Sequence, residues 1–298
     1  MEKKKIIIIT VSILIVIMLL TLCTVLIIIP EKKKNEKYNS AIEYLQNNEY
    51  EEAYNVFSEL VQYKDSEEYK NNCVEKAKEK ISADMEAEDY ESALSGCEFV
   101  KKVEDITETY NKAMNSYIIK LRDDGESEKA YELLDEATTL DDKEKGKVIE
   151  YYIVNLIRGN EVEKGIETLK NRKNDMTDDE VSFVLKEYIG KVVYRDYTYN
   201  SLYSSMKNPS SLSINSVNSR TGLYYKDFNS YGKSGGKLGE DYSSNYSSDF
   251  PIFTLHVTIN YRGTNSFGGT APGQTTFFYM GRLNEDYSIS ELTEKLRF

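Results

Sequence analysis

The sequence predicts a mainly helical chain in three parts: an N-terminal transmembrane helix, a stack of helical hairpins, and a small C-terminal α+β domain with an antiparallel sheet. Three observations predict this fold class. Residues 6–29 contain no charge, proline or glycine. Apolar residues then recur at helical spacing, with no proline between Pro30 and Pro209. After about residue 205, Tyr, Ser, Gly and Thr replace Glu and Lys, and patterns typical of strands begin.

The apolar segment 6–29 has 24 residues, which at about 1.5 Å per residue matches a hydrocarbon core of ~30 Å. A cleaved signal peptide is the alternative interpretation, but its apolar region is usually about 7–15 residues and ends in small residues. We therefore expect an uncleaved signal anchor, preceded by a short tail (1–5) and followed by a basic linker (30–34).

The orientation of such an anchor rests on weak signals, because lysines flank it almost equally on both sides. A single anchor near the N-terminus usually leaves its short tail in the cytoplasm. We therefore expect a single-pass protein of the cell membrane with an extracellular body, and a cytoplasmic body is the alternative.

The charge of the chain is concentrated in its middle. Residues 35–200 carry 23 basic and 40 acidic residues, whereas residues 201–298 carry nine and eight. An acidic body argues against nucleic acid as a partner, because phosphates need basic patches. Solvated helix faces are the favoured interpretation of this charge, over a surface for cations or basic partners.

The middle of the chain predicts nine helices, because helix breakers interrupt the helical pattern at regular points. The expected ranges are 35–47, 50–62, 66–86, 89–102, 106–123, 127–139, 143–158, 161–172 and 178–206.

Every second helix of this series opens with the same packing device, a small residue with larger ones three before and four after it. The small residue recurs at intervals of 40, 37 and 35 residues. It lets a paired helix approach closely, while its larger neighbours seal the contact. The four sets are Tyr50, Ala53 and Phe57; Tyr90, Ala93 and Cys97; Ser127, Ala130 and Leu134; Val162, Gly165 and Leu169.

The stretch from Tyr44 to Phe57, with Asn48-Glu49-Tyr50-Glu51-Glu52-Ala53, resembles the turn and second helix of the tetratricopeptide repeat family. The resemblance covers a domain of residues 35–176 and implies an α-solenoid whose groove holds peptides or partner proteins. The alternative is a spacer without a partner. The packing residues belong to the core in both cases.

Residues 177–298 are expected to form a long helix followed by the small α+β domain. Short strands are predicted at 213–219, 222–228, 252–261 and 275–283, and a closing helix at 289–296. In the clearest strand, 252–261, alternate residues are apolar, which predicts one buried face. Residues 229–249 are expected to be a mobile loop.

Two polar motifs flank the strands of this domain: Asn208 with Pro209, and Asn265 with Phe267, Gly268 and Gly269. They resemble a small domain found at the end of secreted or membrane-tethered bacterial proteins. Asn208 and Pro209 stop the preceding helix, the glycines permit a tight hairpin turn, and Phe267 fills the core. A ligand-holding loop is the alternative for this cluster.

The sequence offers little catalytic chemistry. Cys73 and Cys97 are expected to be buried thiols, with a disulfide as the alternative. His256, the single histidine, is expected on the exposed face of a strand; a Ser-His-Asp set in a hydrolase stays open. Gly232-Lys233-Ser234 lacks the context of a phosphate loop. Paired aspartates at helix ends match no metal loop.

We therefore expect no enzyme, cofactor or metal. The preferred function is a membrane-anchored scaffold that binds a protein or peptide through its repeats and its C-terminal domain. The alternative is a cell-envelope sensor or cell-wall-binding protein, in which the C-terminal domain holds a wall polymer and the repeats form a stalk. Exposed tyrosines at 224–246 could stack on sugars or peptides.

Overall fold

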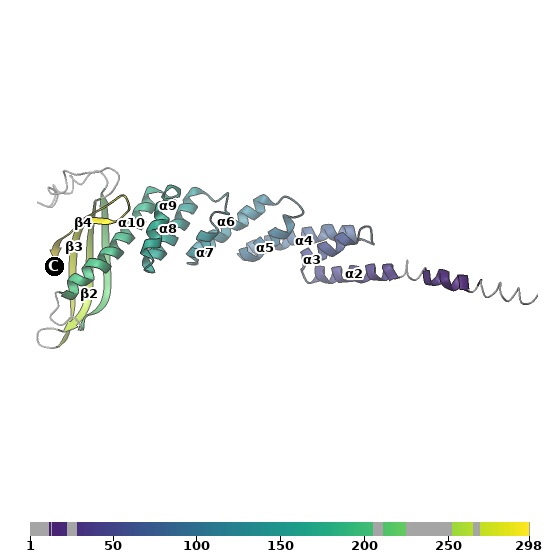
Figure 1. Cartoon of the computed structure of the whole chain (residues 1–298), viewed down its shortest axis with the longest axis horizontal. Helices are drawn as coiled ribbons and strands as arrows, with labels where there is room; N and C mark the ends of the chain where they lie inside the picture. Colours follow the sequence, from purple (N-terminus) through teal and green to yellow (C-terminus); the bar gives the residue numbers. More distant parts are fainter. Residues whose placement is uncertain are drawn as a thin grey trace, which may run out of the picture. The chain divides into compact units, whose positions relative to one another are not determined.

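The computed structural model describes residues 12, 14–22, 29–204, 211–224, 252–264 and 269–297. The chain is mainly helical and ends in an antiparallel sheet curved like half of a barrel (Figure 1). It divides into two compact units, Met1–Tyr117 and Ile118–Phe298, and the division falls inside helix α6 (Thr107–Asp123).

The prediction of an N-terminal transmembrane helix is wrong for the structure described. Among the residues that the structure describes, no helix is long and apolar enough to cross a membrane. Residues 14–22 are helical. The next helix, α2 (Ile29–Gln46), carries an acid and three consecutive lysines near its start. The remaining predicted positions, 6–11, 13 and 23–28, lie outside the described residues.

In the first unit, successive helices pack against one another in order along the chain. After α2 come α3 (Tyr50–Glu59), α4 (Ser66–Glu86) and α5 (Tyr90–Val100). One core cluster gathers around Phe57 and Cys73, where Phe57 stacks on Tyr69 with ring centroids 5.4 Å apart. A second cluster gathers around Cys97 and includes Ala113 of α6.

A single turn geometry recurs four times in the helical region. One residue in each turn has a positive φ, between 56° and 88°, and the N–H of the next residue donates to the carbonyl five positions earlier at 2.8–2.9 Å. This is the Schellman arrangement, which satisfies carbonyls at a helix end and turns the chain sharply. The positive-φ residues are Asn48, Glu88, Gly125 and Asn160, each two residues before the start of the next helix.

The second unit continues with α7 (Ser127–Glu132), α8 (Asp142–Arg158) and α9 (Val162–Arg172). A short 3-10 turn, η2 (Lys173–Asp175), leads to α10 (Asp178–Val193), which begins with a capping box between Thr177 and Glu180. Helix α8 packs against α7, α9 and α10.

The long helix expected at 178–206 is interrupted. After α10, a π-helical turn, η3 (Tyr194–Thr198), precedes the short α11 (Tyr199–Ser204). The helix expected at 127–139 likewise ends early, at Glu132.

The sheet is an antiparallel meander in the order β1-β2-β3-β4. Its strands are β1 (Ser213–Tyr224), β2 (Ile252–Thr264), β3 (Thr270–Leu283) and β4 (Ile289–Arg297). The alternation predicted for 252–261 is confirmed from Leu255 to Ile259, whereas at the start of the strand Ile252 and Thr254, on the opposite face, are buried as well.

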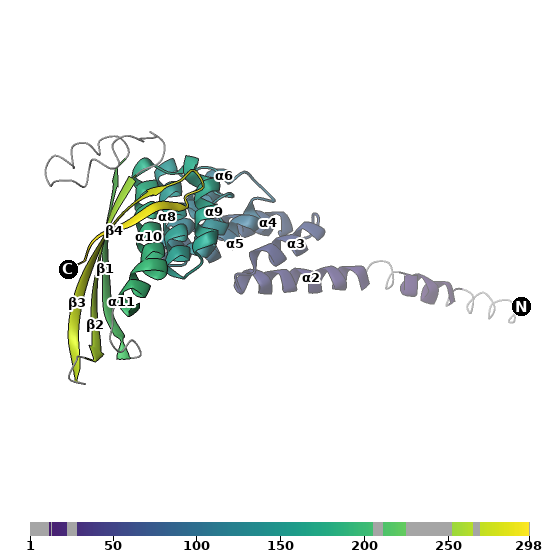
Figure 2. The same cartoon turned by 60° about the vertical axis from the view of Figure 1, so that its left-hand side comes forward.

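Helix α10 lies against the sheet on one side and against α8 on the other (Figure 2). The contact with β1 is close: a β-carbon at Gly190 would lie 3.0 Å from the Ser219 hydroxyl oxygen, and the Thr221 hydroxyl donates to the Lys186 carbonyl at 3.2 Å. This helix therefore fixes β1 to the helical layer.

Several strand predictions need correction. The helix expected at 289–296 is strand β4, because pairing with β3 outweighs the local helix preference of its Glu, Leu and Lys residues. The strands expected at 213–219 and 222–228 form one continuous strand as far as Tyr224. Pro272 lies within β3; β4 pairs with β3 only from Phe277 onward, so β3 tolerates a proline there.

Candidate functional site

The predicted packing residues lie inside the helical layers. The small residues Ala53, Ala93, Ala130 and Gly165 are buried, and so are Phe57, Cys97, Leu134 and Leu169; Tyr50 and Tyr90 are half-buried. A β-carbon at Gly165 would lie 3.1 Å from the Ile157 side chain on α8, which is the close approach that a small residue permits. These side chains hold the helices together.

The predicted motif of the C-terminal domain cannot be placed as a unit. Asn208, Pro209, Asn265, Phe267 and Gly268 lie outside the described residues, as does Gly232-Lys233-Ser234. Only Gly269 is described, and it is exposed directly before β3.

Cys73 and Cys97 are buried free thiols, as expected. Burial raises the pKa of the Cys73 and Cys97 thiols to about 11. Because the thiolate is the reactive form, neither side chain is a nucleophile near neutral pH.

His256 lies on the exposed face of β2, as expected, with its ring edge-on to Phe278 at 4.6 Å between centroids. Within the described part of the chain, no serine or carboxylate forms a hydrogen bond with it. The described residues also contain no group of three or more His, Cys, Asp or Glu side chains that could hold a metal ion.

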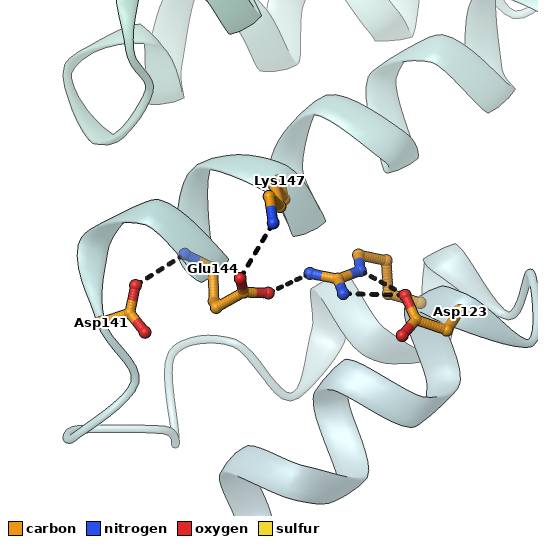
Figure 3. A network of polar contacts seen from close by, with 5 residues as sticks. Asp123, Asp141, Glu144 and Lys147 are labelled. Carbon is orange, nitrogen blue, oxygen red and sulfur yellow. Dashed lines mark hydrogen bonds and ion pairs between the residues drawn. The ribbon is translucent and has the colours of Figure 1, made fainter.

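The most connected polar network joins the end of α6 to the start of α8 (Figure 3). The Arg122 guanidinium is almost buried and donates to Glu144, which also accepts from Lys147 at 3.0 Å. The bond from Arg122 holds the pKa of Glu144 below its ordinary value. Asp141, in one of the paired aspartates, caps α8 by accepting from the Glu144 backbone N–H at 3.0 Å. Every group is satisfied internally, so this network supports the fold.

A hollow of about 320 Å³ lies between α3, α4 and α5 in the first unit. Two of its acidic side chains are already paired with basic ones: Lys102 binds Glu51 at 2.7 Å, and Lys80 binds Asp84 at 2.8 Å. An incoming ligand would therefore have to break existing ion pairs.

A larger groove, of about 760 Å³, lies in the second unit between α9, α10, η3 and the start of β4. We call it the α9–α10 groove. Its apolar lining consists of Val162, Ile166, Val192 and Ile289, and its charged lining consists of Glu163, Glu167, Lys170, Arg195 and Asp196. A concave site with an apolar part and a few charged groups is the usual form of a binding site.

The polar groups of this groove influence one another. Burial, more than any other cause, raises the pKa of Tyr188, and nearby Asp286 adds to the effect. Ser288 donates from both its hydroxyl and its N–H to Asp286, which lowers the pKa of that carboxyl. Arg195 forms a two-point ion pair with Asp196, at 2.6 and 2.9 Å.

The π-helical turn η3 places three successive residues, Arg195, Asp196 and Tyr197, on the groove. Tyr197 is 44% exposed, although it is aromatic. Turns of this kind are rare and are frequent at functional sites. Sequence reasoning missed this groove, because its residues come from four elements and the sequence carries no signal for the π turn.

In comparisons with known proteins, no family model, curated protein or solved structure matches this chain.

Proposed function

We propose that this chain is a non-catalytic binding protein that takes a segment of a protein or peptide partner in the α9–α10 groove. The observation that carries the proposal is the groove itself, with an apolar lining, charged groups of both signs and an exposed tyrosine. The repeat-like helix α9 and the C-terminal sheet both contribute to it, which fits the scaffold expected from the sequence.

The chemistry of the lining defines the partner. The apolar residues Val162 and Ile166 favour an apolar anchor side chain, because burying one is worth about 1.5–3 kcal/mol. Glu167 and Lys170 are exposed charges of opposite sign on the same helix, one turn apart. They favour a partner with charges on both sides of its anchor, which would set orientation more than affinity.

The test is a selection of random peptides on the full-length protein, followed by fluorescence anisotropy with the enriched peptides. Tyr197→Ala should weaken their binding about tenfold, because exposed tyrosines at a binding site contribute strongly. Lys170→Glu should weaken peptides that carry an acidic residue beside the anchor.

Each of these variants has a matched control. Tyr151 on α8 is 47% exposed and does not line the groove, so Tyr151→Ala should bind normally. Lys143→Glu, also on α8, controls for the change in charge. If no peptide is enriched, or if the groove variants bind as well as the controls, the proposal is wrong.

The outer face of the sheet favours a second candidate, a wall polymer rich in hydroxyl groups. Asn260 donates to Ser216 and accepts from Gln274, both at 2.9 Å, and Thr258 bonds to Thr276 at 3.0 Å. This ladder of amides and hydroxyls crosses three strands. Sedimentation of the full-length protein with insoluble peptidoglycan tests it; loss of binding in Asn260→Ala would support it, and a failure to sediment would exclude it.

A further inference from the structure

Strand β1 is an edge of the sheet, approached by α10 at Ser219 and Thr221. Residues 215–220 are all exposed, although successive residues of a strand point to opposite faces. On its other side β1 pairs with β2 along its length, apart from a bulge between Ile214 and Ser216. Within the described part of the chain, no strand pairs with its outer side. Its outward N–H and C=O groups therefore form a template for another strand.

The two edges of the sheet differ in the features that block strand addition. Four of the nine residues of β4 are charged, and its pairing with β3 shifts register twice. Charges and bulges of this kind protect an edge. Between Ser216 and Tyr224, β1 has no bulge and no proline, and Arg220 is its single charged residue.

Arg220 gives the open edge a chemical preference. It is exposed, lies opposite His256 on β2, and His256 in turn lies opposite Phe278 on β3. Among the described residues, no carboxylate forms an ion pair with Arg220. A guanidinium favours carboxylates, which it can bind at two points.

We propose that the β1 edge binds an extended peptide as an added strand, with an acidic side chain of the peptide beside Arg220. The exposed stretch 215–220 spans about 20 Å, enough for about six peptide residues. Alternate residues of β1 direct both backbone groups outward, so backbone hydrogen bonds supply the affinity and Arg220 sets the register.

A second copy of this chain is a poorer occupant of the same edge. Two β1 strands paired with each other would bring two arginines and no carboxylate to the new contact, since β1 contains no acidic residue. An acidic residue of a peptide would attract Arg220, whereas the arginine of a second β1 strand would repel it. This surface is separate from the α9–α10 groove, and its failure would leave the groove proposal intact.

The test is a peptide selection on the full-length protein and on Arg220→Glu in parallel. Peptides selected by the wild type should carry an acidic residue at one fixed position, and Arg220→Glu should lower their affinity about fivefold or more. Selection on Arg220→Glu should enrich basic residues at that position. Arg262→Glu is the control, because Arg262 is also exposed but lies on β2, opposite the first residue of β1.

Backbone pairing is tested by N-methylation of the selected peptides. In a bound strand, the backbone N–H groups of every second residue face β1. Methylation of these N–H groups should abolish binding, whereas methylation of the N–H groups between them should leave it nearly unchanged. Selection without an acidic preference, equal effects of Arg220→Glu and Arg262→Glu, or tolerance of both methylation patterns would overturn the proposal. So would a dimer in sedimentation velocity that Arg220→Glu alone disrupts.

Discussion

The recurring turn predicts that alanine destabilises the protein at Gly125 but not at Gly159, although both are glycines at helix ends. Gly125 has a φ of 88°, and no atom lies within 4 Å of the position that a β-carbon would take. Gly125→Ala therefore creates no clash, and its cost is that of a left-handed L-residue, about 1–2 kcal/mol. The reduced freedom of the unfolded chain offsets about 0.4–1 kcal/mol of this cost. The expected net loss is about 1 kcal/mol.

The control, Gly159→Ala, changes a residue with a φ of −75°, because the left-handed residue of that turn is Asn160. Its stability should stay within about 0.5 kcal/mol of the wild type. Gly125→Asn should cost less than Gly125→Ala, because asparagine tolerates this conformation and occupies it at Asn48. Glu88→Gly should stabilise the first unit by about 0.5–1 kcal/mol, because Glu88 has a positive φ that glycine adopts without strain.

Thermal and urea unfolding followed by far-UV circular dichroism measure these differences. For a unit of this size, 1 kcal/mol corresponds to about 2–4 °C in Tm. Equal effects of Gly125→Ala and Gly159→Ala would refute the argument from φ, as would a Glu88→Gly protein less stable than the wild type.

Two further predictions concern buried groups. Arg122→Met should lower the free energy of unfolding by about 2–3 kcal/mol, because it leaves the half-buried Glu144 without its main partner, and adding Glu144→Leu should recover most of the loss. The pKa of Glu144 is lowered in the folded state, so its ion pair with Arg122 stabilises the fold above the ordinary pKa of 4.5. This stabilisation is lost as the pH falls below that value. In urea titrations Arg122→Met should therefore lose less stability on acidification than the wild type does. Cys73 and Cys97 should resist a disulfide reagent at pH 8 and react fully in denaturant; rapid labelling of the folded protein would show that they are accessible.

The bounds of the helices could be predicted where residues that break helices stand out in the sequence. The helix at 66–86 and the starts at Tyr50 and Ser127 are confirmed, and the starts expected at 89 and 161 each fall one residue before the observed starts, Tyr90 and Val162. The tetratricopeptide resemblance stays a prediction.

Three features of the structure depend on tertiary contacts and could not be predicted from the periodicity of the sequence. The segment at 289–296 has the composition of a helix, but its backbone completes the sheet beside β3. The π turn at 194–198 falls inside a pattern that reads as one long helix. The α9–α10 groove combines residues from 162 to 289, so no local window of sequence contains it.

Helix α10 connects the two proposed binding surfaces. It lines the groove with Tyr188 and Val192, and it approaches β1 at Gly190, where a β-carbon would lie 3.0 Å from Ser219. Gly190→Val should therefore push β1 away and cost about 1–3 kcal/mol of stability. It should also weaken peptides selected for either surface, whereas Lys170→Glu and Arg220→Glu should each weaken one class. Binding assays of both peptide classes on the three variants separate these outcomes. If Gly190→Val leaves both classes unchanged, α10 does not position either surface.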